Sequence, residues 1–264
     1  MPSTPLLPPD GLPLAGKRGL IVGIANEHSI AYGCAKAIRA QGGAIAATWL
    51  NEKARPFVEP LLEQLGADIV GPLDVEQPGQ LEAIFDEITR RWGRLDFVLH
   101  AVAFAPAADL HGRVADCSAA GFARAMDISC HSFVRMAHLA EPLMKDGGAL
   151  ITMSYYGAQK VIPNYGIMGP VKAALEAVVR VLAAELGPAG IRVHAVSPGP
   201  IRTRAASGIG AFEQILDDAA RRAPEHQLVT IDDVGAATAL LCSDAARALT
   251  GNVLFVDAGY HVMG

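Results

Sequence analysis

The segment Met153–Lys172 (MSYYGAQKVIPNYGIMGPVK) carries the side chains best suited to chemistry. Tyr165 and Lys172 are seven residues apart, which is about two helical turns, so a helix would place both on one face. Lys172 could hold ribose hydroxyls, and its charge would favour a more acidic phenol on Tyr165. Such a hydroxyl can act as an acid or stabilise an oxyanion. The alternative is that Tyr155 and Tyr165 only pack, with their hydroxyls in water.

A second segment, Gly23–Gly33 (GIANEHSIAYG), has the residues of a phosphate-binding turn. It follows an apolar run and leads into a helical pattern that opens at Ser29. Gly23 permits a sharp turn, and the N–H groups and hydroxyl at Ser29 can face a pyrophosphate. The spacing is not G-x-G-x-x-G, so a strand–turn–helix without a ligand is the alternative. A P-loop spacing at Gly11–Lys17 lacks the Ser/Thr that binds Mg²⁺, because Arg18 follows.

The residues that would meet an adenosine leave the cofactor type open. Asp74 follows the third apolar run, where its carboxylate could accept from an adenine amino group or cap a helix. An NAD site would place an acid, and an NADP site an arginine, just after the second run. Leu50 is neutral there, and Glu52 and Arg55 come later. These residues alone do not choose between NAD and NADP.

Short apolar runs alternate with helix-length stretches along the chain. Continuously apolar strands followed by helices predict an α/β fold, a single-domain, doubly wound, Rossmann-like parallel sheet of about seven strands. The expected strands are Gly19–Gly23, Ala44–Trp49, Asp68–Gly71, Phe97–Ala101, Ala149–Met153, Ile191–Val196 and Val253–Val256. The expected helices include Ser29–Ala40, Leu81–Trp92, Phe122–Met144, Val171–Leu186 and Ile231–Leu241.

Length and composition bound the organisation of the chain. The 264 residues are 51% hydrophobic and 19% charged, which excludes a disordered protein and allows a full core. We expect an extended, proline-rich tail over residues 1–13 and one dinucleotide-binding domain over 14–264. The Pro/Gly-rich stretch Ser197–Gly210 predicts a ligand loop at the carboxyl edge of the sheet, within a substrate loop over 199–212.

Charge and cysteine usage restrict the partners and the compartment. The net charge of −5 argues against nucleic acid or an anionic membrane as the main partner. No apolar run approaches the ~20 residues of a membrane helix, and no secretion signal is visible. The four cysteines form no C-x-x-C, which predicts a reducing cytoplasm. The histidines are scattered, so we expect no metal site.

These motifs resemble the short-chain dehydrogenase/reductase superfamily and, more narrowly, the bacterial enoyl-acyl-carrier-protein reductases. The superfamily's usual Tyr-x-x-x-Lys pair is absent, because Met168 stands four residues before Lys172. The enoyl reductases use Tyr-x6-Lys with another tyrosine ten residues earlier, a spacing that Tyr155, Tyr165 and Lys172 match. The resemblance runs from residue 16 to about 260 and includes SIAYG at 29–33, FAP at 104–106, SYYGA at 154–158, IPNYGIMG at 162–169, GPIRTRAASGI at 199–209, DVG at 233–235 and LCSD at 241–244.

The resemblance implies an enzyme that reduces the C2=C3 bond of trans-2-enoyl thioesters on acyl carrier protein, the last reductive step of fatty acid elongation. It implies NADH as cofactor, with NADP not excluded, and a homotetramer. The implied catalytic residues are Tyr155, Tyr165 and Lys172. The implied substrate-binding residues are Ala105, Tyr155, Tyr165, Met168 and Phe212. The implied cofactor-binding residues are Gly23, Ser29, Ile30, Leu50, Asp74, Val75, Val102, Lys172, Ile201 and Thr203.

Three residues depart from the family pattern. Leu50 stands where many NADH-using members carry Gln, and Ala103 replaces a Gly of some members. Pro170 requires that the active helix either starts near Gly169 or kinks there.

Two alternative functions stay open on the sequence. One is a reductase of ketones or other small carbonyls, against which the lack of a tyrosine at position 168 counts. The other is a non-catalytic dinucleotide-binding paralogue. A serine hydrolase is excluded because no G-x-S-x-G occurs. Arg202 and Arg204 could meet the acidic carrier protein, or could be solvated surface residues.

Overall fold

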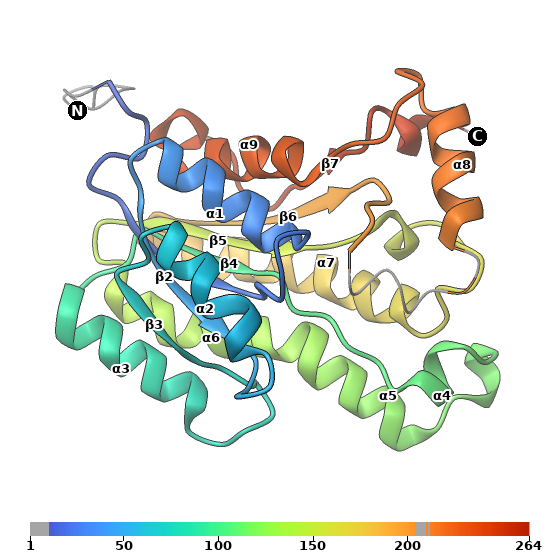
Figure 1. Cartoon of the computed structure of the whole chain (residues 1–264), viewed down its shortest axis with the longest axis horizontal. Coiled ribbons are helices and arrows are strands. Elements are labelled where there is room, and N and C mark those ends of the chain that lie inside the picture. Colours follow the sequence, from blue (N-terminus) through green and yellow to red (C-terminus); the bar gives the residue numbers. More distant parts are fainter. Residues whose placement is uncertain (1–10, 204–209, 211, 264) are drawn as a thin grey trace.

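The fold is a twisted parallel sheet with helices on both faces (Figure 1). The computed structural model describes residues 11–203, 210 and 212–263, so most of the predicted tail at 1–13 lies outside the described residues. The seven strands, in the spatial order β3-β2-β1-β4-β5-β6-β7, confirm the predicted doubly wound topology. They are β1 (Arg18–Val22), β2 (Ala44–Trp49), β3 (Ile69–Pro72), β4 (Phe97–His100), β5 (Gly148–Met153), β6 (Ile191–Pro198) and β7 (Val253–Val256).

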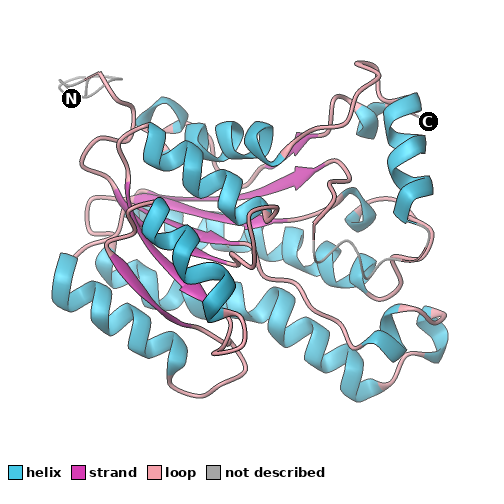
Figure 2. Ribbon diagram, in the orientation of Figure 1, coloured by secondary structure: helices cyan, strands magenta, loops and turns pink. Residues whose placement is uncertain are grey.

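Two apolar cores hold the helices against the sheet. One core joins α1 (Ile30–Ala40), α2 (Arg55–Gln64) and α9 (Ile231–Cys242) to one face. The other joins α3 (Gln80–Trp92), α6 (Ser132–Ala140) and α7 (Met168–Leu186) to the opposite face (Figure 2). The central strands are therefore buried on both sides, which explains why their sequences are continuously apolar instead of alternating.

Two glycines bring α1 and α9 into close contact beside the first strand. A Cβ on Gly33 would lie 2.2 Å from the carbonyl oxygen of Ile231, and one on Gly235 would lie 2.5 Å from that of Gly33. Only glycine leaves room for backbones to approach this closely. The contact fixes the position of α1, whose N-terminus opens onto the candidate site.

The helix expected over Phe122–Met144 is interrupted, so that prediction is wrong in detail. The chain forms α5 (Ala119–Met126), a π-helical turn over Asp127–His131, and then α6. Within the turn, the hydroxyl of Ser129 accepts from the backbone N–H of Phe104 at 2.9 Å and donates to its carbonyl at 3.0 Å. The widened turn thus holds the loop that follows β4, consistent with the frequent placement of such turns at functional sites.

Three further helices were not among the predicted elements. They are α2, the short α4 (Ala107–Leu110) and α8 (Phe212–Arg222). Helix α8 follows the predicted substrate loop directly, and in Figure 1 it lies at the right, on the side of the molecule toward which β6 points. Pro170 lies in the first turn of α7, which begins at Met168, where a missing N–H costs no helical hydrogen bond. Of the two alternatives that Pro170 left open, a helix start near Gly169 or a kink, the structure shows the helix start.

Candidate functional site

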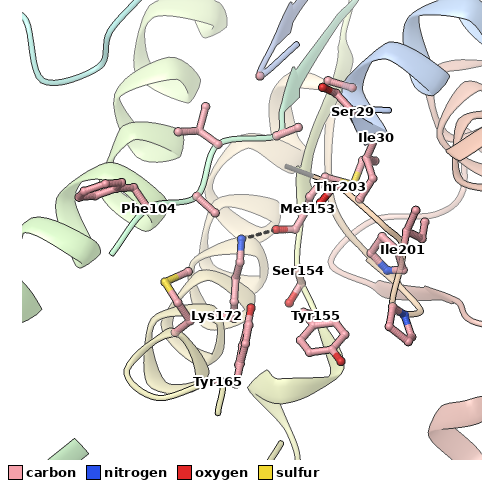
Figure 3. A pocket seen from close by; sticks show the side chains of 18 of the residues that line it. Ser29, Ile30, Phe104, Met153, Ser154, Tyr155, Tyr165, Lys172, Ile201 and Thr203 are labelled. Carbon is pink, nitrogen blue, oxygen red and sulfur yellow. Dashed lines mark hydrogen bonds between the residues drawn. The ribbon is translucent and has the colours of Figure 1, made fainter. Parts of the chain in front are cut away.

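A cavity of about 360 Å³ opens at the carboxyl edge of the sheet. Parallel α/β sheets bind ligands at this edge, where the direction of the crossovers reverses; here that point lies between β1 and β4. The loops after β1, β4, β5 and β6 line the cavity, together with the starts of α7 and α8 (Figure 3). It brings together twelve of the predicted site residues, namely Gly23, Ser29, Ile30, Val102, Ala105, Tyr155, Tyr165, Met168, Lys172, Ile201, Thr203 and Phe212.

The three predicted adenine-end residues do not line this cavity. Leu50 follows β2 and is 53% exposed. The carboxylate of Asp74 accepts from the backbone N–H of Glu76 at 3.0 Å, while its own N–H donates to the side chain of Gln80 at 2.8 Å. Val75 is buried. Asp74 therefore shapes the turn after β3, and an adenine contact by these three residues stays a prediction.

The turn after β1 fits a dinucleotide phosphate. Gly23 has φ +115°, and a Cβ there would lie 2.3 Å from the carbonyl oxygen of Ala101, so no other residue fits without a shift. The N-terminus of α1 carries no acidic side chain in its first turn, and the N–H groups of its first two residues, Ile30 and Ala31, precede the first helical hydrogen bonds, which run from Tyr32 and Gly33 to the carbonyl of Ser29. A helix N-terminus beside a close backbone approach is the arrangement that binds pyrophosphate.

The hydroxyl of Ser29 forms hydrogen bonds within the turn, and its predicted contact with a pyrophosphate stays a prediction. It accepts from the N–H groups of Ala25 and Asn26, each at 3.0 Å, and donates to the side chain of Asn26 at 3.2 Å. The hydroxyl is thus used within the turn and fixes its shape. The backbone N–H groups at the start of α1 are the groups available to a phosphate.

Tyr165 and Lys172 meet at the other end of the cavity. Lys172 is 4% exposed, and its ammonium donates to the carbonyl of Met153 at 2.6 Å. Tyr165 is 8% exposed, and its ring packs edge-on against Tyr155 with 4.9 Å between ring centroids. In Figure 3 the hydroxyl of Tyr165 points toward Lys172, whereas that of Tyr155 points away from it. The predicted convergence of residues 165 and 172 on one cavity is present in the structure.

The geometric reason for this convergence differs from the predicted one. Tyr165 precedes α7, so the pair does not share a helix face. Positive φ angles at Asn164 (62°) and Gly166 (50°) turn the chain on either side of Tyr165. The ring then packs over Gly157, where a Cβ would lie 2.5 Å from it. The positive φ angles on both sides of Tyr165, together with the absence of a side chain at Gly157, therefore position the phenol.

Burial sets the protonation states at this end. It raises the pKa of Tyr165 above its ordinary value, with a smaller contribution from Tyr155, so the prediction of a more acidic phenol is wrong for this structure. Burial also raises the pKa of Tyr155. The pKa of Lys172 falls to about 8, again because of burial. Near neutral pH the site holds a neutral hydroxyl donor beside a cation.

Several residues that line the cavity were not predicted as site residues. Ser154 was visible only as the residue before Tyr155, and Leu110 belongs to the unpredicted helix α4. Phe104 lies in the matched FAP motif, and the guanidinium of Arg124 sits 4.7 Å from its ring centroid. Arg124 also forms a two-bond pair with Glu76 at 2.7 Å, which joins the turn after β3 to this loop.

The predicted substrate loop is described only in part. Ile201 and Thr203, near the start of the loop, and Phe212, at its end, all line the cavity. Residues 204–209 and 211, including Arg204, lie outside the described residues. The guanidinium of Arg202 pairs with the carboxylate of Glu213 at 2.7 Å. Its charge is therefore matched within the chain, which weakens the expectation that it meets a carrier protein.

The described residues contain neither a metal-binding cluster nor a membrane-spanning helix. Over 11–203, 210 and 212–263, no group of three or more His, Cys, Asp or Glu side chains is arranged to hold a metal ion. In the same part of the chain, no helix combines the length and apolarity needed to cross a bilayer.

Comparisons with known proteins agree with the geometry. The family model described as enoyl-(acyl carrier protein) reductase matches residues 23–261. Enoyl-[acyl-carrier-protein] reductase [NADH] 1 of Rhizobium meliloti is 49% identical, over 94% of this chain and 92% of that protein. The Anaplasma phagocytophilum enoyl-acyl-carrier-protein reductase, solved with NAD, is 47% identical with a TM-score of 0.92, over 96% and 97% of the two chains. The Bacillus cereus enoyl reductase, solved with NADP⁺ and an indole naphthyridinone, is 40% identical with a TM-score of 0.93, over 96% and 99%.

Proposed function

Because the chain belongs to the enoyl-acyl-carrier-protein reductase family, we infer that it reduces the C2=C3 bond of trans-2-enoyl thioesters carried by acyl carrier protein. This is the last reductive step of fatty acid elongation, and NADH is the cofactor. The observation that carries the inference is the pair formed by Tyr165 and Lys172 in one cavity, opposite a phosphate-binding turn at Gly23.

The cofactor fits the observed turn, cavity and charge. When bound, NADH supplies the hydride that reduces C3 of the enoyl chain. We propose that Gly23 and the start of α1, at Ile30, hold its pyrophosphate, as the positive φ and the open N–H groups of this turn favour. The ammonium of Lys172 would donate to the nicotinamide ribose, next to Val102. On the other side, Ile201 and Thr203 would contact the carboxamide.

Tyr165 is the proposed donor to the substrate. As C3 accepts the hydride, negative charge develops on the thioester oxygen as an enolate, and protonation at C2 completes the reduction. The buried, neutral hydroxyl of Tyr165 would donate to that oxygen and stabilise it most strongly in the transition state. Tyr155 packs against this ring and would hold it in place beside the substrate. The apolar side chains of Ala105, Met168 and Phe212 would contact the acyl chain.

The proposal also includes the residues at the adenine end of the cofactor site, the extent of the domain and the assembly. Leu50, Asp74 and Val75 would meet the adenosine, because β2 and β3 end at this edge of the sheet. Residues 14–264 would form one reductase domain, with Phe212, at the end of the loop 199–212, beside the acyl chain. A homotetramer in the cytoplasm is the proposed state, as the family resemblance implies. Multi-angle light scattering after gel filtration tests the assembly, and a mass near one chain would refute it.

A spectrophotometric assay tests the function. We expect oxidation of NADH with crotonyl and longer trans-2-enoyl thioesters, and little or none with an acetoacetyl thioester. The comparison separates enoyl reduction from carbonyl reduction, since both consume the same cofactor. NADPH in place of NADH measures the cofactor preference. Faster turnover of the acetoacetyl thioester, or binding of NADH without oxidation by any enoyl thioester, would contradict the proposal.

A further inference from the structure

A buried carboxylate lies one helical turn beyond Lys172. Glu176 on α7 is 4% exposed. One carboxylate oxygen accepts from the hydroxyl of Ser154 at 2.7 Å, and the other accepts from the side-chain amide of Gln159 at 3.0 Å. Both of these partners are neutral. Transfer of a carboxylate from water to the protein interior costs free energy. A contribution of Glu176 to the site is therefore expected to offset this cost.

Glu176 and Lys172 hold adjacent residues at the end of β5. The ammonium of Lys172 donates to the carbonyl of Met153, and the carboxylate of Glu176 accepts from the side chain of Ser154. Two opposite charges on successive turns of α7 thus attach the helix to the strand end that leads into Tyr155. Ser154 and Tyr155 both line the cavity, so this attachment sets part of its wall.

Glu176 also provides the charge that opposes Lys172. Burial lowers the pKa of Lys172 to about 8, while Cys130 and Glu176 act in the opposite direction. Of the titratable groups around the ammonium, burial lowers the pKa of His100 to about 3 and raises those of Cys130 and Tyr165. These three groups are therefore neutral between pH 6 and 8, so the negative charge that acts on Lys172 is that of Glu176, one turn further along α7.

We propose that Glu176 is a positioning residue of this reductase: its carboxylate holds Ser154 at the cavity wall and balances the charge of Lys172, so that the ammonium stays available to the cofactor's ribose. The inference rests on the proposed function, because it assumes that Lys172 contacts the cofactor. Neither the family motifs nor the spacing of Tyr165 and Lys172 assigned a role to this residue.

The test compares Glu176→Gln with the wild type from pH 6 to 9. Glutamine keeps the shape and an acceptor oxygen but removes the charge. The readouts are NADH binding, by fluorescence titration, and kcat/KM for NADH, which reports groups of the free enzyme. We expect the alkaline limb of both profiles to move about one pH unit lower, the order of the shift caused by the loss of one nearby opposite charge. At pH 6 the variant stays within about twofold of the wild type, and at pH 8 it binds NADH about fivefold more weakly.

Four further variants separate charge from structure. Glu185→Gln makes the same charge change at an exposed position of α7 and should leave both profiles in place. Ser154→Ala removes the hydrogen bond but not the charge, so it should lower kcat without moving the limb. Glu176→Asp, which keeps the charge at a shorter reach, should retain the wild-type limb, and Glu176→Asn removes the charge at that same reach and replaces Glu176→Gln in the comparison if the latter does not fold.

Two outcomes are distinguishable. An alkaline limb that stays in place in Glu176→Gln, or that moves equally in Glu176→Asp, would overturn the role of Glu176. If NADH binding follows the expected pH dependence but no enoyl thioester is reduced by the wild type, the proposed function fails while the relation between Glu176 and Lys172 stands.

Discussion

Tyr165→Phe is expected to lower kcat on a crotonyl thioester by about 10²–10³, which is the typical cost of removing one oxyanion donor. The phenol is buried and neutral, so its contribution is a hydrogen bond to the developing enolate oxygen. The phenylalanine ring keeps the edge-on contact with Tyr155 and the seat over Gly157. The KM for NADH should change little, because the hydroxyl is assigned to the substrate. Steady-state kinetics with NADH and crotonyl thioester measure both quantities.

A matched control is Tyr32→Phe. Tyr32 lies on α1, is similarly buried, and donates to the side chain of Gln64 at 3.3 Å, outside the cavity. Its loss should leave kcat unchanged. Turnover of Tyr165→Phe within twofold of the wild type would reject the donor role. A large rise in the KM for NADH alone would show that the hydroxyl contacts the cofactor and not the substrate.

Lys172→Met should weaken NADH binding and lower kcat/KM for NADH by about 10². Methionine fills the space of the buried stem but removes a charge-assisted donor, and such hydrogen bonds are worth about 1.5–3 kcal/mol. The variant also leaves the carbonyl of Met153 without the donor that now reaches it at 2.6 Å. Calorimetric titration with NADH, alongside the melting temperature, separates lost binding from lost folding.

Lys145→Met is the control for this change. Lys145 is exposed and precedes β5, at the edge of the sheet opposite the cavity. It should bind NADH as the wild type does. A Lys172→Met variant that folds and binds NADH with unchanged affinity would show that the ammonium does not contact the cofactor.

The fold was predictable because its strands are buried on both faces. Largely apolar runs such as Gly19–Gly23 and Ala44–Trp49 predicted the strands, and the predicted bounds agree with the observed ones within two residues. Helix α2 was missed since Pro56 and Pro60 interrupt its pattern, although Pro56 falls in the first turn. The π-helical turn could not be read from periodicity, because its evident function is a tertiary contact between Ser129 and the loop after β4.

Most residues of the site were predicted from the sequence, but the way in which the chain positions them was not. Spacing alone placed Tyr165 and Lys172 together, but by a shared helix face, whereas the structure uses a turn with positive φ at Asn164. The raised pKa of Tyr165 follows from burial, which the sequence does not report. Glu176 was overlooked, although a carboxylate four residues after Lys172 in an otherwise apolar helix is a visible signal.

The most direct measurement is a crystal structure with NAD⁺ and an enoyl thioester analogue bound. The account predicts the ammonium of Lys172 within hydrogen-bond distance of the nicotinamide ribose, and the hydroxyl of Tyr165 at the thioester oxygen beside the same nucleotide. A dinucleotide bound elsewhere, or one whose ribose and thioester lie apart from these two groups, would contradict the chemistry while leaving the fold intact.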